Sequence, residues 1–321
     1  MSYSKISPLP WLLLLCGLLS FFSCNRKDFK NEQILKANKY VQLGEFEKAI
    51  QIYTKLAKVG FSPAYTSLGS MYFSGDGVPV DKKKAIELFE KAALGGDIVA
   101  VINLGHIYAY GNGLEKDCYK GLGLLKEASR AGHRRSSYLL GNIYSEGLCG
   151  EQDSKKAEYY YSLNIKQGGI EGDTGRAKMY QYGYGVTKDL EKAISYYNKA
   201  FVNGSPYAAN SLARICLSRN KNSEDCFNLF EKSYELGSVI AGYNIAALAY
   251  TGAVIPQDCS KSLIWAKKTA KKGHVGSMRL IGRIHESGCL GVIDNDEAYK
   301  WFFKAAVLGD NYSKKRIENR F

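Results

Sequence analysis

Small and apolar residues recur along most of the chain with a spacing of about 36 residues. Each repeat has a small residue at an anchor position, and in the first four repeats a Tyr follows three positions later. An Asp and a closing Gly keep the same register. The anchors are Gly69, Gly105, Gly141, Ala177, Ala213, Ala246 and Gly282. This register predicts a repeat protein in which each unit packs mainly on its neighbours.

Each repeat is predicted to form two antiparallel helices, A and B. In the first repeat, helix A is expected over residues 64–73 and helix B over 82–94, because apolar residues recur there at helical spacing. The Gly-rich segment 75–78 between them allows a tight reversal, since Gly adopts positive φ without penalty. Asp81 then stands at the N-cap of helix B, where its carboxylate can accept backbone N–H bonds. Its equivalents are Asp117, Asp153, Asp189, Asp258 and Asp294.

The pattern A-xxx-L-G-xx-Y-xx-G-x-G-V, followed by D-xx-K-A-xxx-[FY]-xx-A-xx-G, closely resembles the Sel1-like repeat family, a relative of the tetratricopeptide repeats. Residues 64–96 match it almost throughout, and residues 172–204 match nearly as well. The resemblance covers residues 61–309. It implies an all-α fold, a right-handed superhelical α/α solenoid of about seven repeats. Residues 25–60 resemble a tetratricopeptide-like helix pair that caps the N-terminal end, and residues 310–321 are expected to form a C-terminal capping helix.

Residues 1–24 have the features of an export signal. Their apolar run, residues 11–22, has the length of a signal-peptide core and is shorter than the roughly 20 residues that span a bilayer. The segment resembles a bacterial lipoprotein signal with Cys24 as the lipidated residue, although Phe21 stands where Leu is usual. A cleaved secretory signal and an uncleaved anchor are the alternatives. All three place the rest of the chain outside the cytoplasm, and the resemblance favours an outer-membrane lipoprotein on the periplasmic or surface face.

Six of the eight Cys lie beyond the signal. The fifth repeat, residues 207–237, has lost three residues and its Gly-x-Gly loop, and a Cys stands on each side of what remains. Elsewhere, a Cys directly after a capping Asp is followed by a Cys in the next repeat's loop. An even number of Cys in an exported chain favours disulfides, so this register predicts the pairs Cys118–Cys149, Cys216–Cys226 and Cys259–Cys289. Six buried free thiols are the alternative.

The sequence offers little that indicates catalysis. It contains no GxSxG, HExxH, Walker A or GxGxxG motif, and no Cys/His set has zinc spacing, so no catalytic residue, cofactor or metal is predicted. His133 and His274 share one repeat position, which indicates a structural turn role, and His285 takes the Tyr slot of the seventh repeat. Residues 218–221 fit SxxK, but no SDN or KTG follows. Some Cys-rich relatives are described as penicillin-binding or β-lactamase-like, so a hydrolase of cell-wall peptides or β-lactams is the alternative function.

Lys and Arg outnumber Asp and Glu by 44 to 31, which gives a basic surface. Such a surface suits acidic proteins, anionic lipid or nucleic acid. Nucleic acid is disfavoured, because the chain is expected to be exported and its charge is spread over many repeats. The predicted partner is therefore a protein or peptide of the bacterial envelope or of a host, with membrane attachment through the lipid, and the chain is expected to be monomeric.

In tetratricopeptide-like superhelices helix A lines the concave face. The lining positions are expected three residues before the anchor, one after it and four after it. The candidate groove residues are Tyr138, Asn142, Lys178, Arg214, Tyr243, Arg279 and Arg283. The forked guanidinium of Arg pairs well with carboxylates, and Tyr offers contact area at low entropic cost. An acidic peptide, or one that ends in a C-terminal carboxylate, is therefore the expected ligand. A merely solvated surface is the alternative. The first hypothesis is a non-catalytic interaction scaffold of the cell envelope.

Overall fold

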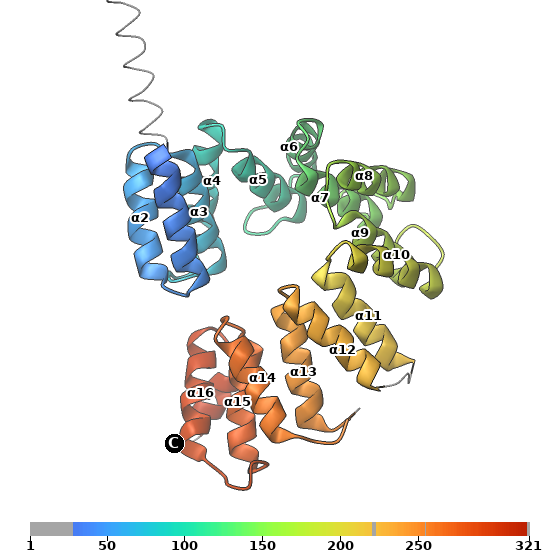
Figure 1. Ribbon diagram of the computed structural model, residues 1–321. Coiled ribbons are helices and arrows are strands. Elements are labelled where there is room, and N and C mark those ends of the chain that lie inside the picture. The colour runs from blue at the N-terminus through green and yellow to red at the C-terminus, as the bar shows by residue number, and fades with distance from the viewer. Residues whose placement is uncertain (1–27, 220–222, 254, 320–321) are drawn as a thin grey trace, which may run out of the picture. The chain divides into compact units, whose positions relative to one another are not determined.

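The computed structural model describes residues 28–219, 223–253 and 255–319, and these residues form helices and turns without a β-strand (Figure 1). The predicted signal and Cys24 lie outside the described residues. A helix over residues 28–42 precedes α2 (Phe46–Lys58). The following helices are α3 (Ser62–Ser74), α4 (Lys82–Leu94), α5 (Ile98–Tyr110), α6 (Cys118–Arg130), α7 (Arg134–Glu146), α8 (Ser154–Lys166), α9 (Gly172–Tyr182), α10 (Leu190–Val202), α11 (Pro206–Ser218), α12 (Ser223–Glu235), α13 (Val239–Thr251), α14 (Cys259–Ala270), α15 (Val275–Ser287), α16 (Asn295–Val307) and α17 (Asn311–Glu318).

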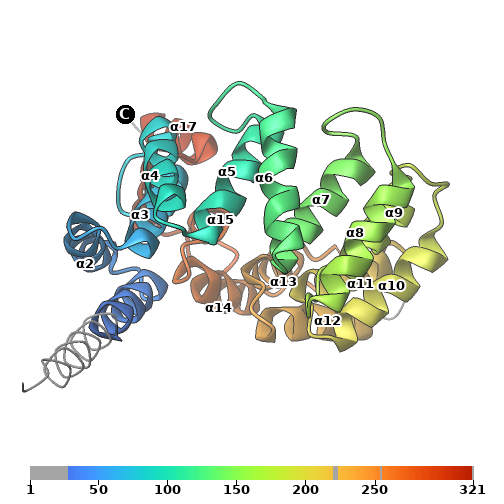
Figure 2. The ribbon, with the colours of Figure 1, turned by 90° about the horizontal axis from the view of Figure 1, so that it is seen from above.

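The A helices carry the odd numbers from α3 to α15, and the B helices carry the even numbers from α4 to α16. The chain divides into two compact bodies, with the boundary between Ala128 and Ser129. Within the second body, α7, α8, α9 and α10 follow one another in the order of the sequence (Figure 2). This is the arrangement of an all-α solenoid, and none of the described helices is long and apolar enough to cross a membrane.

The turn chemistry of the repeats follows the sequence prediction. The expected helix B is α4 itself, and the Asp81 carboxylate accepts the Lys84 N–H at 2.9 Å. The five equivalent Asp residues cap their B helices in the same way. Helix α3 begins two residues earlier than expected, because Pro63 suits a first helical turn. Gly75 and Gly77 have φ of 84° and 72°, which permits the reversal between α3 and α4.

The anchor positions are small because a large side chain of the paired B helix fills the space above them. A Cβ atom added at Gly69 would lie 2.8 Å from the Phe89 ring, and one at Gly141 would lie 2.4 Å from the Tyr161 ring. The filling residue recurs on successive B helices as Phe89, Leu125, Tyr161 and Tyr197, all buried. On α2, Tyr53 occupies the same register and is 2% exposed, so the first helix pair packs as a repeat does.

Disulfides join elements of the second body. Cys216 of α11 is bonded to Cys226 of α12, with Cα atoms 5.5 Å apart. Cys259 at the start of α14 is bonded to Cys289 in the loop after α15, with Cα atoms 6.0 Å apart. These are two of the three predicted pairs. Cys118 and Cys149 are also disulfide-bonded, and the pairing of one with the other stays a prediction.

Candidate protein-binding face

Basic side chains directly after the anchor lie on the open side of the A helices. Arg214 and Arg283 are exposed, and Lys178 is half-buried. Two of the three lie over a Tyr of a neighbouring A helix. The Lys178 Nζ is 5.5 Å from the centroid of the Tyr207 ring on α11, and the Arg283 Cζ is 5.2 Å from the ring of Tyr250 on α13. Each cation is therefore held against an aromatic ring, and both remain open to an incoming anion.

Tyrosines gather around Lys178 and Arg214. Tyr182 at the end of α9 and Tyr207 on α11 are 41% and 43% exposed. Beneath them, the buried Tyr197 ring lies 6.5 Å from that of Tyr207 and donates its hydroxyl to Gln181 at 2.6 Å. Burial raises the pKa of Tyr197 and Tyr207, and the neighbouring tyrosines raise it further, so both hydroxyls stay neutral.

We call Lys178, Tyr182, Tyr207 and Arg214, together with Tyr138 of α7, the aromatic–basic face. Tyr138 is half-buried and lies 6.2 Å from Tyr161, measured between ring centroids. The face combines rings that can bury area with cations that can meet carboxylates. Three successive A helices, α7, α9 and α11, supply its residues.

The candidate residues nearer the C-terminus form a separate group. Arg279 of α15 is ion-paired with Asp310 at 2.8 Å, and Asp310 caps α17 by accepting the Ser313 N–H. Arg279 therefore serves first to attach the C-terminal helix. The Tyr243 ring lies 4.8 Å from that of His274 and is half-buried. Arg283 is exposed, and its guanidinium lies over the Tyr250 ring.

The prediction that Asn142 lines the groove is wrong. Its side chain is buried, and its Oδ1 accepts the Tyr161 hydroxyl at 2.9 Å. Gly141 and Gly175 leave the space that the Tyr161 ring fills, so the buried phenol needs a nearby acceptor. Asn142 meets this need from the position that is open in the other A helices.

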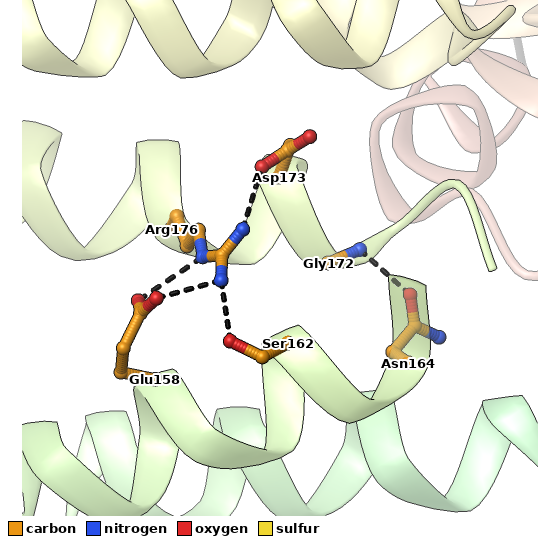
Figure 3. Close-up of polar contacts among 6 residues, drawn as sticks. All are labelled: Glu158, Ser162, Asn164, Gly172, Asp173 and Arg176. Atoms are coloured by element: carbon orange, nitrogen blue, oxygen red, sulfur yellow. Dashed lines mark hydrogen bonds and ion pairs between the residues drawn. The ribbon is translucent and has the colours of Figure 1, made fainter. Parts of the chain in front are cut away.

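Sequence reasoning missed a partly buried ion cluster between α8 and α9 (Figure 3). Arg176 stands directly before the anchor, where the other A helices have Leu or Ile. Its guanidinium donates to Asp173 at 2.9 Å, to Glu158 at 3.0 Å and to Ser162 at 2.6 Å. The available signal was a charged residue in an apolar slot, three residues after an Asp. The cluster fixes α9 against α8 and so positions Lys178, two residues later, on the other side of the helix.

Two of the histidines singled out by sequence lie at turns. His274 caps α15, its Nδ1 accepting the Ser277 N–H at 3.1 Å, whereas His133 caps α7 without a side-chain bond. His285 is half-buried on α15, and its Nε2 is buried without a partner among the described residues. Ser218 donates to the Ile215 carbonyl at 2.8 Å, while Lys221 lies outside the described residues. No group of His, Cys, Asp and Glu in the described ranges could hold a metal ion.

The helix pairs, their anchors and their Asp caps define an α-solenoid built from repeated helical hairpins. The chain belongs to the Sel1 repeat family. Seven stretches match the family's sequence profile, and together they cover more than half of the chain. They are residues 62–97, 98–133, 135–168, 173–203, 206–238, 241–274 and 276–310.

Solved structures and a curated relative resemble the chain. A Sel1 repeat protein from Oxalobacter formigenes covers 100% of this chain and 98% of its own, with 22% identity and a TM-score of 0.55. Yeast Tom70 covers 87% of this chain and 62% of its own, with 14% identity and a TM-score of 0.63. At these identities the likeness shows the fold alone. Chitin synthase regulatory factor 3 of Schizosaccharomyces pombe is 27% identical over 154 residues, which are 45% of this chain and 16% of that protein.

Proposed function

We propose that this protein is a non-catalytic interaction scaffold of the cell envelope that binds an acidic segment of a partner protein on the aromatic–basic face. Sel1 repeat proteins generally bind other proteins, which supports the broad function. The observation that carries the finer proposal is the Lys178 ammonium group over the exposed Tyr207 ring, with Tyr182 and Arg214 also exposed on the same two A helices. The matched family gives no support to a β-lactam or cell-wall hydrolase.

The two kinds of side chain would contribute differently to binding. Exposed ion pairs are worth only about 0.2 to 1 kcal/mol each, because water and salt screen them. Tyr rings that become buried at an interface are frequent hot spots, with losses of about 2 kcal/mol or more on truncation to Ala. Tyr182 and Tyr207 are therefore expected to supply most of the affinity. Lys178 and Arg214 would select an acidic partner and speed its association at low salt.

The envelope location rests on Cys24 and the signal-like segment before it. A lipid on Cys24 would hold the mature chain at a membrane. Incorporation of a labelled fatty acid into the full chain, compared with the Cys24→Ser variant, tests this part separately. Label that is equal in both variants would contradict the lipid anchor and leave the binding face untouched.

The binding face is tested by photocrosslinking in intact cells. A photoreactive amino acid at Tyr207 is expected to capture a discrete partner, and the same group at Tyr119 of α6, which is 93% exposed and far from the face in sequence, serves as the control. The charge reversal K178E/R214E should abolish capture from position 207. The matched control K155E/K166E makes the same change in net charge at exposed positions of α8 and should leave capture intact.

Capture that survives K178E/R214E in a folded variant, or that is lost equally in K155E/K166E, would contradict the proposed face. Circular dichroism and thermal melting of each purified variant establish that it is folded. A binding site elsewhere on the chain would then be found by moving the photoreactive group along the A helices.

A further inference from the structure

The first helix pair has an open groove that the binding face does not use. The groove encloses about 730 Å³ between the helix over residues 28–42 and α2. Its lining consists of Phe29, Lys30, Gln33, Ile52, Lys55, Leu56 and Val59. Phe29 and Val59 are 59% and 60% exposed, so the groove presents apolar surface to its surroundings. Among the described residues, no helix precedes this pair to cover the groove.

The groove is apolar inside and basic at its edge. Lys30 and Lys55 belong to its lining, and Lys58 lies in the same last turn of α2 as Lys55. Lys side chains can lay their methylene stems along apolar surface while the ammonium group stays in water. Apolar residues surrounded by Lys are typical of protein surfaces that insert shallowly at the interface of a bilayer with anionic lipids. Charge complementarity therefore favours an anionic lipid surface over a neutral apolar segment of the chain.

The place of the groove along the chain favours the same occupant. Phe29 follows Cys24 by five positions, with four residues between them. Five positions of fully extended chain span at most about 17 Å. A lipid on Cys24 would therefore keep the groove close to the membrane, where even a weak surface interaction is populated because the effective concentration of lipid is high.

We infer that the open groove of the first helix pair docks on the surface of an anionic membrane, with Phe29 and Val59 entering the interface and Lys30, Lys55 and Lys58 facing the headgroups. This inference rests on the proposed lipid at Cys24. The lipid supplies attachment, and the groove fixes the orientation of the first helix pair relative to the bilayer.

Depth-dependent fluorescence quenching tests the docking. The full lipidated chain is placed in vesicles of phosphatidylethanolamine and phosphatidylglycerol whose acyl chains are brominated, and Trp reporters are introduced as F29W and V59W. The parent chain, which has its own Trp residues, provides the background. Shallow insertion predicts about a twofold loss of reporter fluorescence. The control reporter Y119W lies in the same body, at a side chain that is 93% exposed, and should be quenched little.

A charge-reversal variant and vesicle flotation separate the two proposals. K30E/K55E/K58E should still float with the vesicles but should lose the quenching of F29W. Flotation with F29W quenched no more than Y119W would overturn the docking and leave the lipid anchor standing. A chain that fails to float would overturn the anchor, and with it the docking. A blue shift of F29W that depends on protein concentration and not on brominated lipid would assign the groove to a second copy, which also overturns the inference.

Discussion

The first and fifth repeats close the same antiparallel helix turn by different chemistry. Between α3 and α4 the reversal is made by backbone conformation, with Gly75 and Gly77 at positive φ. At the end of α11, Arg219 has a φ of −98°, and the Cys216–Cys226 bond joins α11 to α12 instead. The glycine turn forms in any compartment, whereas the cystine turn needs an oxidising one. The fifth repeat therefore ties part of the stability of this protein to oxidising conditions.

The largest effect is expected from removing disulfides in the second body. In the chain-entropy account, C216A/C226A opens a loop of about 11 residues and should cost about 3 kcal/mol of unfolding free energy, while C259A/C289A opens one of about 31 residues and should cost about 4 kcal/mol. Denaturant unfolding of each variant under oxidising conditions measures both values.

Reduction of the native protein provides the control, because it breaks the bonds without changing a side chain. Each double variant should lose less stability on reduction than the native protein does. Equal sensitivity to reductant in C216A/C226A and the native protein would mean that the Cys216–Cys226 bond contributes nothing to closing the fifth repeat.

The glycine turn of the first repeat is broken by Gly77→Ala. Gly77 has a φ of 72°, and an added Cβ would lie 2.2 Å from the Cβ of Phe46. Left-handed backbone costs a non-Gly residue about 1 to 2 kcal/mol, and overpacking adds about 1 to 3 kcal/mol. Gly96→Ala is the matched control, since Gly96 has a φ of 83° and open space around it. Denaturant unfolding should give the larger loss for Gly77→Ala, and equal losses would show that contact with Phe46 is relieved at no cost.

Features that depend on one repeat and its register were predictable from sequence. The bounds of α4 and the capping role of Asp81 follow from local spacing, because an N-cap needs only the backbone three residues ahead. Features that depend on what a neighbouring helix offers were not. Asn142 stands at a repeat position that is open in the other A helices, yet its side chain is buried because it accepts a hydrogen bond from the Tyr161 hydroxyl of α8.

The same limit applies where a charged residue stands at an apolar position of the repeat. Arg176 breaks the apolar pattern, and its partners Glu158 and Ser162 on α8, together with Asp173, explain how a partly buried guanidinium is tolerated there. The candidate binding face was predicted in its residue types. Its grouping around Tyr182 and Tyr207 was not, because neither ring stands at a position that the repeat register singles out.

A smaller loss of stability is expected when the N-cap of a B helix is removed. Asp81→Ala removes the bond to the Lys84 N–H and should lower the unfolding free energy by about 1 kcal/mol. Asp81→Asn keeps an acceptor at the N-cap and should recover most of this loss. Thermal melting of the two variants distinguishes capping from a general effect of charge, and an equal loss in both would assign the contribution of Asp81 to its charge near the helix terminus.

The smallest expected effect is a pH dependence of stability, which can be compared between two histidines at equivalent repeat positions, His274 and His133. Burial, followed by the charge of Arg279, lowers the pKa of His274 below its ordinary value of 6.5, and its Nδ1 must be unprotonated to accept the Ser277 N–H. The unfolded chain therefore takes up the proton first as the pH falls. The stability that His274 contributes is full above pH 6.5 and declines below it, toward the lower pKa of the folded state.

Urea unfolding at pH 7.5 and 5.5 should show this decline, of about 0.5 kcal/mol for a partly exposed cap. His274→Asn should abolish that share of the pH dependence, whereas His133→Asn, at a cap without a side-chain bond, should leave it unchanged. A pH dependence that is the same in both variants would mean that the His274 cap bond does not couple protonation to folding.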